Sequence, residues 1–352
     1  MFRIGQIDYD LAELRLDQAL QSRFLRKVFF ITGATGLLGS MFVRSLLYLN
    51  ARYALDIKVM AAVRTKKRAK QVLGDMLKNS ALHLVEWQAG EPLYVSAAVD
   101  YILHAASITS SKQMVSAPVD TIRTAVYGTD RVLQFAAEKK ARVLYLSSME
   151  AYGRLPDLQR DIVETDLGYL DLTRVRTDYG ESKRICESLC TAYASEYAVE
   201  VVIARLAQSF GAGILPEENR VFAQFARAIL HGEDIVLNTT GKSEGNYCYL
   251  MDVMMAFFVL LAKGASGNIY NVSNEACHMT IREMAELAAR EFSAGRSKVV
   301  VDIPEDIERL GYAQDVKMRL SSAKLRQLGW QPRIDLTEAY RRMLIYMKEQ
   351  SR

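Results

Sequence analysis

Short apolar runs alternate with longer stretches of helical periodicity through the first two thirds of the chain. The runs favour buried parallel strands, and they lie at 28–32, 57–63, 82–86, 101–104, 143–147 and 199–204. The stretches at 37–49, 118–140 and 177–197 repeat their apolar residues at helical spacing. This alternation predicts an α/β fold, built on a doubly wound parallel sheet with right-handed crossovers.

The alternation weakens after residue 205 and divides the chain into two parts. We expect residues 28–205 to form the main domain. Residues 206–352 should form a smaller α/β region over the carboxyl edge of the sheet, where folds of this kind bind ligands. The apolar segment 269–272 is expected to rejoin the main sheet. The other predicted elements of this region lie at 221–231, 235–237, 252–263, 280–292 and 321–328.

Residues 1–27 precede the first strand and form an N-terminal extension. Its apolar residues are spaced loosely like one face of a helix, and they are Leu11, Leu14, Leu20 and Phe24. We therefore expect one extra helix that packs on the fold or on a partner chain.

A glycine-rich turn joins the first strand to the first helix, in the segment TGATGLLG. Gly33 permits the tight turn, Gly36 lets the backbone approach a pyrophosphate, and Gly39 lets the helix pack close to the strand. The helix N-terminus then offers free N–H groups to the anion. An ordinary strand–turn–helix connection is the alternative. The predicted contacts to the cofactor phosphates are Gly33, Thr35, Gly36, Leu37, Leu38 and Gly39.

Composition narrows the class of protein without naming one. The 352 residues are 50% hydrophobic and 24% charged, with a net charge of +4, a balance that favours neither nucleic acid nor a membrane surface as partner. No apolar run reaches the roughly 18 residues of a spanning helix, and the acidic N-terminus is unlike a signal peptide. We expect a cytoplasmic protein. The four cysteines include no C-x-x-C pair, so we expect free thiols and no protein-built metal site.

Tyr179 and Lys183 are four residues apart on a predicted helix, so they share one face. An ammonium group beside a phenol should lower the pKa of the phenol, which would make Tyr179 an acid/base for a sugar hydroxyl. Ser148 ends the fifth predicted strand and is placed to hydrogen-bond the same oxygen. Alone, such a pair is more often a solvated helix face.

Taken together, the motifs resemble those of the extended short-chain dehydrogenases/reductases, in the group of nucleotide-sugar epimerases and dehydratases. The segments that carry the resemblance are TGATGLLG (32–39), HAAS (104–107), SSMEAYG (147–153), YGESK (179–183), RLAQSFGAG (205–213) and LGW (328–330). The resemblance implies a Rossmann-type domain that holds NAD(P) and a C-terminal region that holds a nucleotide-diphosphate sugar.

The resemblance also implies roles for particular residues. Ser148, Tyr179 and Lys183 match the catalytic triad, and the segment under the cofactor is matched by Ala105, Ala106 and Ser107, with Ser147 as a further cofactor contact. The helices 118–140 and 177–197 match the pair that forms the usual homodimer. Their apolar residues are Ile122, Val126, Leu133, Ala137, Ile185, Leu189 and Ala192.

Two departures from the family pattern affect the predicted substrate site. Gly245 stands where such proteins often carry an arginine that holds the substrate pyrophosphate, and Gln208 replaces the usual asparagine. Another cation is then needed, and Arg220 and Lys242 are the nearest candidates. We predict substrate contacts from Gln208, Asn219 and Arg220, together with Ser148 and Glu150.

The end of the second strand bears on the choice of cofactor. NAD-binding Rossmann folds place an acid there, on the ribose 2′-hydroxyl, whereas this chain reads Val-Arg-Thr-Lys-Lys at 63–67. An arginine suits a 2′-phosphate, so we predict a preference for NADP(H) through Arg64, with NAD(H) as the alternative. A solvated basic helix start would look the same.

Glu150 lies two residues past Ser148, where 4,6-dehydratases of this group carry a carboxylate. Oxidation at C4 makes the C5 proton acidic, and a carboxylate there could remove it. Glu150 therefore favours a 4,6-dehydratase that acts by transient C4 oxidation. Met149 stands where some dehydratases have a second acid, and decarboxylases also carry a glutamate here. A 4-epimerase, an NADPH-dependent keto-sugar reductase and a non-catalytic cofactor-sensing protein remain as alternatives.

Overall fold

A seven-stranded parallel sheet forms the centre of the molecule in the computed structural model, which describes residues 5–156, 159–305 and 315–351. Its strand order is β10-β6-β5-β4-β1-β2-β3, as expected for a doubly wound fold. The strand predicted at 269–272 pairs with β6 at the edge. The bounds are β1 Val28–Thr32, β2 Lys58–Val63, β3 Leu82–Glu86, β4 Tyr101–His104, β5 Arg142–Ser148, β6 Val201–Leu206 and β10 Ile269–Val272.

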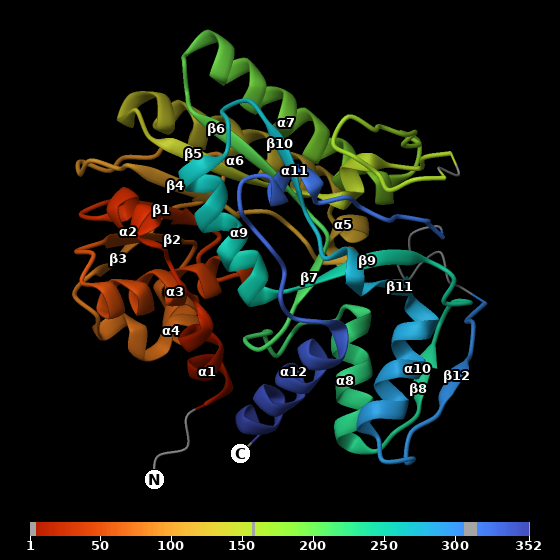
Figure 1. Ribbon diagram of the computed structural model, residues 1–352. Coiled ribbons are helices and arrows are strands. Elements are labelled where there is room, and N and C mark those ends of the chain that lie inside the picture. The colour runs from red at the N-terminus through yellow and green to blue at the C-terminus, as the bar shows by residue number, and fades with distance from the viewer. Residues whose placement is uncertain (1–4, 157–158, 306–314, 352) are drawn as a thin grey trace.

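Helices cover both faces of this sheet, with α6 and α7 above it and α3 and α4 below it in Figure 1. Alternate strand residues serve the two layers: Phe29 and Ile31 pack toward α3, and Phe30 packs toward α6. This alternation explains why the strands are apolar throughout. The bounds are α3 Leu37–Tyr53, α4 Lys66–Leu73, α5 Ser111–Ser116, α6 Pro118–Lys139, α7 Asp178–Glu196 and α9 Leu250–Lys263, with a 3-10 turn η1 at Gly74–Lys78.

The C-terminal part adds two small sheets and a group of packed helices, seen at the lower right of Figure 1. One sheet has the order β11-β9-β7, and the other pairs β12 with β8. Sequence patterns missed β7, β9, β11, β12 and α12, and α11 is shorter than the helix predicted at 321–328. The bounds are β7 Gln208–Phe210, α8 Val221–His231, β8 Ile235–Leu237, β9 Glu244–Tyr249, η4 Glu275–Cys277, β11 His278–Thr280, α10 Ile281–Phe292, β12 Val299–Val301, α11 Ala323–Arg326 and α12 Leu336–Gln350.

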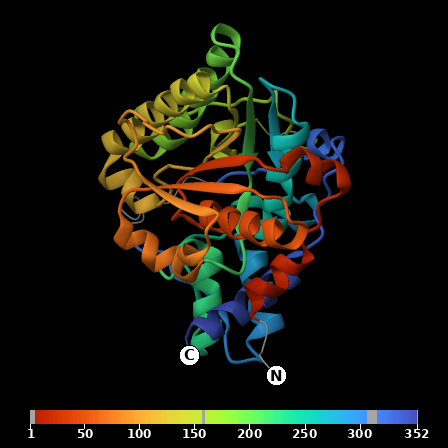
Figure 2. The same ribbon diagram turned by 90° about the vertical axis from the view of Figure 1, so that its left-hand side faces the viewer.

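The N-terminal extension forms two short helices, α1 (Gln6–Glu13) and α2 (Gln18–Phe24), so the prediction of a single helix is wrong. The first helix ends at Leu14, whose backbone is extended, and Asp17 starts the second helix as its N-cap, because its side chain accepts a hydrogen bond from the Leu20 N–H. The predicted apolar face is buried all the same, and Phe24 contacts the rings of Phe29 and Tyr101. Figure 2 shows this red segment beside the blue C-terminal helix.

All four cysteines are free and buried. Cys186 and Cys190 share one face of α7 and pack into the core under α6. Among the described residues, no helix combines the length and the hydropathy needed to cross a bilayer.

Candidate active site

The glycine turn between β1 and α3 has the geometry predicted for it. Gly33 has a φ of +64°, and a Cβ there would lie 2.7 Å from the carbonyl carbon and oxygen of Ala105. A Cβ at Gly39 would lie 2.2 Å from the Gly33 oxygen. Gly36 is the N-cap of α3, and no side chain caps this helix. The turn therefore leaves a side-chain-free cradle at a helix N-terminus, which fits a pyrophosphate.

The two strands beneath this turn are joined by Thr32 and His104. The Thr32 hydroxyl accepts hydrogen bonds from the Ala105 and Ala106 N–H groups, each at 3.1 Å. His104 lies between Thr32 at 2.8 Å and Thr129 at 3.1 Å. Burial, and then the charge of Lys183, lowers the pKa of His104 to about 3. This neutral histidine fixes the start of the segment 105–107, and sequence reasoning missed its role.

Arg64 lies at the carboxyl end of β2 with its side chain exposed. The residues around it are engaged elsewhere: Lys66 pairs with Glu86 at 2.9 Å, and Arg68 pairs with Glu217. Arg64 takes part in none of the ion pairs found among the described residues. Its position at the end of β2, next to the glycine turn along the sheet, is the one that meets the adenine ribose in folds of this kind.

The predicted catalytic residues come together from β5 and α7. Tyr179 is 7% exposed, and the Ser148 side chain at the end of β5 is close enough to act on the pKa of its phenol. Lys183 is 4% exposed, donates a hydrogen bond to the Leu146 carbonyl at 2.7 Å, and lies 5.6 Å from the centre of the Tyr179 ring. Burial lowers the pKa of Lys183 to about 8.

The expected lowering of the pKa of Tyr179 is wrong for the protein as it stands. Burial raises the pKa of Tyr179, because it removes water from the phenolate, and the negative charge of Glu150 raises it further. The Ser148 side chain and the charges of Arg220 and Arg176 act on the pKa in the opposite direction without reversing the shift. The phenol is therefore held in its neutral form until something else in the site favours the anion.

Glu150 is held by an arginine that sequence reasoning did not single out. It lies in η2 (Met149–Tyr152), and Arg176 lies in η3 (Val175–Thr177), one turn before Tyr179. Arg176 donates two hydrogen bonds to the Glu150 carboxylate, at 2.6 and 3.1 Å. Both groups are partly exposed, with side-chain exposures of 32% for Glu150 and 19% for Arg176. A carboxylate and a guanidinium thus both act electrostatically on Tyr179.

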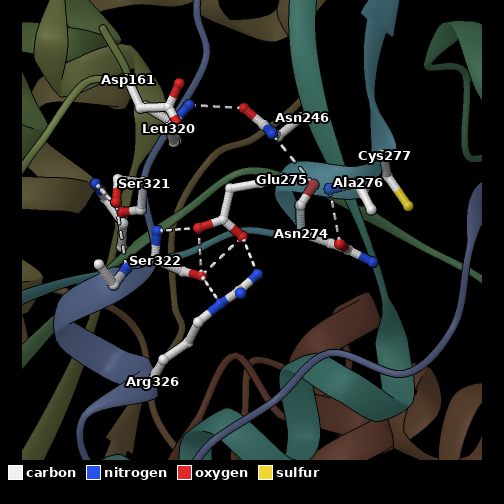
Figure 3. A network of polar contacts seen from close by, with 12 residues as sticks. Asp161, Asn246, Asn274, Glu275, Ala276, Cys277, Leu320, Ser321, Ser322 and Arg326 are labelled. Atoms are coloured by element: carbon white, nitrogen blue, oxygen red, sulfur yellow. Dashed lines mark hydrogen bonds and ion pairs between the residues drawn. The ribbon is translucent and has the colours of Figure 1, made fainter.

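Strand β9 contains Gly245, the position that departs from the family pattern. Successive residues of a strand point to opposite sides, so Gly245 and Asn246 have different environments. Gly245 faces the site, because a Cβ there would meet only the Met149 side chain, at 3.7 Å. Asn246 points the other way, accepting a hydrogen bond from the Leu320 N–H at 2.7 Å and donating one to the Asn274 carbonyl at 3.1 Å. Figure 3 shows this network, in which Glu275 also binds Arg326. There is therefore room for a Cβ at position 245, whereas the Asn246 side chain joins β9 to the segments that contain Asn274 and Leu320.

The other predicted substrate contacts lie on the loop between β7 and α8. Arg220 begins α8, is held by Glu218 at 2.6 and 3.0 Å, and acts electrostatically on Tyr179. Asn219 precedes it, and Gln208 is partly buried in β7. Lys242 is exposed in the turn before β9. Of the two candidate cations, Arg220 is the one whose charge acts on Tyr179.

Ser147 has a different environment from its neighbour Ser148. Its hydroxyl donates a hydrogen bond to Glu187 at 2.5 Å, and Glu187 also accepts two from the buried Arg205, at 2.9 and 2.7 Å. The side chain thus serves a buried ion pair between α7 and β6. A contact of Ser147 with the cofactor stays a prediction.

This sheet, glycine turn and Ser–Tyr–Lys arrangement define a nucleotide-cofactor enzyme of the short-chain dehydrogenase/reductase type. The model of the NAD-dependent epimerase/dehydratase family matches residues 29–273. The chain belongs to this family, and the sequence-based assignment of fold and family is confirmed. It is accordingly an enzyme of this class.

Individual relatives cover most of the chain. UDP-glucuronic acid decarboxylase 6 of Arabidopsis thaliana is 29% identical over 309 residues, which are 88% of this chain and 85% of the relative. The UDP-glucose 4-epimerase of Thermotoga maritima, solved with UDP-glucose, has a TM-score of 0.78 at 20% identity, over 92% of this chain and 100% of that one. The dTDP-glucose 4,6-dehydratase of Streptomyces venezuelae, solved with NAD, has a TM-score of 0.75 at 23% identity, over 92% and 97%. The two solved structures share the fold.

Proposed function

We propose that this enzyme acts on a nucleotide-diphosphate hexose by transient oxidation at C4. The observation that carries the proposal is the convergence of Ser148, Tyr179 and Lys183 at the carboxyl edge of the sheet. Only β4 separates their strand, β5, from β1, the strand that leads into the glycine cradle. A dinucleotide pyrophosphate fits the cradle because Gly33 and Gly39 let the backbone pack too closely for a side chain, and the N-terminus of α3 has no side-chain cap. When bound, NAD(P) supplies the hydride acceptor for C4.

The chain's own residues handle the C4 hydroxyl proton. Tyr179 takes this proton as general base, and Ser148 shares the hydrogen bond to the same oxygen. Lys183, buried and held by the Leu146 carbonyl, places its ammonium against the Tyr179 ring, where it favours the phenolate. Arg220 gives the diphosphate a cation in place of the arginine absent at position 245. Gln208 and Asn219 are further proposed contacts to the substrate.

The fate of the keto-sugar depends on Glu150. As general base at C5, Glu150 would open the way to loss of water from C6, and this supports the 4,6-dehydratase activity predicted from the sequence. A second candidate rests on Arg176. A guanidinium beside Glu150 suits a substrate with a carboxylate on C5, which a C4 ketone makes ready to leave as carbon dioxide. Met149 in place of a second acid and the decarboxylase relatives both favour this candidate.

A homodimer through α6 and α7 is part of the proposal. The two helices lie side by side, and they expose Val119, Ile122, Tyr127 and Ile185 on their outer surface. Leu133, in contrast, is buried inside the chain. A symmetric partner would cover this exposed apolar surface with a four-helix contact.

Product analysis tests the proposal. Purified enzyme with added NAD or NADP is incubated separately with UDP-glucose, dTDP-glucose and UDP-glucuronic acid. The products are separated, and their masses are determined by mass spectrometry. Loss of water identifies a dehydratase, and loss of carbon dioxide identifies a decarboxylase. A product of unchanged mass with inverted C4 indicates an epimerase. In a separate assay with NADPH and a nucleotide-diphosphate keto-sugar, stoichiometric consumption of NADPH indicates a reductase. An enzyme that transforms no nucleotide sugar and never reduces NAD(P) contradicts the proposal.

A further inference from the structure

The N-terminal extension places a buried carboxylate at the far end of strand β9. Asp10 of α1 is 1% exposed. Its carboxylate accepts hydrogen bonds from the Tyr249 hydroxyl, from Arg342 of α12 at 3.0 Å, and from the Gln6 side chain at 2.9 Å. Arg342 also binds Glu13 and Glu338, so its charge has three acidic partners. The extension is thus tied to β9 and to the last helix at the same point.

Tyr249 in turn supports the backbone that leads to Arg220. A Cβ at Gly211 would lie 2.5 Å from the Tyr249 ring, so the chain passes directly over that ring. The Ala212 N–H donates a hydrogen bond to the Tyr249 hydroxyl at 3.4 Å. We call residues 211–220 the substrate loop, because they connect this contact with Glu218 and Arg220. Ile7 of α1 also lies against the loop at Gly213.

We propose that Asp10 and Tyr249 are positioning residues that hold the substrate loop, and with it Arg220, in the place where Arg220 meets the substrate diphosphate. The Asp10 carboxylate orients the Tyr249 hydroxyl, and that oxygen and ring fix the backbone at 211 and 212. The inference rests on the proposed role of Arg220 and gives the extension, which precedes the family match at residue 29, a part in substrate binding. The contacts of Asp10 and Tyr249 named above reach residues 211 and 212 and include no residue of the glycine turn at 33–39.

Two variants test the inference in the full chain. Asp10→Asn keeps the shape and leaves Arg342 with two acidic partners, and Tyr249→Phe removes only the hydroxyl. We expect the dissociation constant for UDP, measured by calorimetry, and the KM for the nucleotide sugar to rise about tenfold. The reason is that a displaced Arg220 would lose most of its charged hydrogen bond to the diphosphate. The kcat and the NAD(P) affinity should stay within about twofold. Amide exchange across the substrate loop should quicken.

Glu349→Gln is the matched control. Glu349 accepts a hydrogen bond from the Gln6 N–H at 3.1 Å and so also ties α1 to α12, but it has no contact with Tyr249. We expect unchanged UDP affinity and unchanged loop exchange in this variant. Wild-type UDP affinity and loop exchange in Asp10→Asn and Tyr249→Phe would overturn the inference, as would equal losses in the control. If wild-type enzyme binds no nucleotide and transforms no sugar, the proposed function fails, while loop exchange in the three variants still decides whether Asp10 and Tyr249 hold the loop.

Discussion

Arg176 donates two hydrogen bonds to the Glu150 carboxylate from its two terminal nitrogens, at 2.6 and 3.1 Å, and both groups act electrostatically on Tyr179. The carboxylate is therefore oriented by a partner from the same chain before any substrate arrives. Two charged hydrogen bonds of this kind fix geometry as well as charge. Arg176 therefore sets the direction of the Glu150 carboxylate, for which we propose proton transfer at C5 of the sugar.

The first prediction separates C4 oxidation from the step that follows it. Glu150→Gln should still reduce NAD(P) when a cognate sugar is added, because Ser148, Tyr179 and Lys183 remain. It should fail to release the dehydrated or decarboxylated product. Absorbance of the reduced nicotinamide and mass spectrometry of the product measure the two steps. Normal product release in this variant would remove Glu150 from the mechanism.

Arg176→Ala extends the first prediction to the ion pair between Arg176 and Glu150. The Glu150 carboxylate should lose its fixed direction, and the product step should slow by about 100-fold, the scale that a misplaced catalytic group costs. Arg174→Ala is the control, since Arg174 belongs to the same segment and pairs with Asp171 instead. Equal rates in the two variants would show that the Arg176–Glu150 pair has no part in catalysis.

The second prediction concerns Tyr179. Tyr179→Phe should keep NAD(P) binding and lose at least about 100-fold in turnover, the lower range for general acid–base catalysis. Cofactor affinity by fluorescence and steady-state rates give the comparison. A variant that retained most of its rate would assign the proton transfer to another group.

Much of this site could be predicted because it depends on local sequence. The glycine turn combines a strand, a fixed spacing and a helix, and Tyr179 and Lys183 share a helix turn, so short-range geometry places them. Arg176 was missed because its partner Glu150 is 26 residues away in the chain. Strand β9 was missed because it holds glycine and asparagine, which disfavour strands. Its place is set instead by Asn246 and its partners in Figure 3, a tertiary effect that no local pattern records.

The third prediction concerns His104 and the stability of the protein in acid. The native state resists protonation of His104 until about pH 3, whereas in the unfolded chain the group titrates near its ordinary pKa of 6.5. Between these values the unfolded state binds more protons, so the free energy of unfolding should fall as the pH drops below 6.5. His104→Gln can keep hydrogen bonds to Thr32 and Thr129 without this titration. Urea unfolding at about pH 7 and about pH 5 should show a smaller loss in the variant, and identical losses would contradict the assignment.

The fourth prediction concerns the cofactor. Arg64→Ala should weaken NADP(H) binding far more than NAD(H) binding, because the guanidinium at the end of β2 would bind the 2′-phosphate that NAD lacks. Lys67→Ala is a suitable control, as Lys67 is also exposed and lies three residues further on. Calorimetry of the wild type and both variants with NAD and with NADP gives the six affinities to compare. An equal loss for NAD(H) and NADP(H), or wild-type enzyme that binds NAD alone, would contradict the preference.

The fifth prediction concerns the outer surface of α6 and α7. Ile185 is 48% exposed on α7, and a charge placed there would be buried without a partner if two copies met through these helices. Ile185→Glu should therefore turn a dimer into a monomer, as measured by light scattering at micromolar concentration. Ile303 is equally exposed, at 48%, and lies outside these helices beyond β12, so Ile303→Glu should leave the dimer intact. A wild-type protein that is already monomeric, or a dimer that survives Ile185→Glu, would show that this apolar surface has another role.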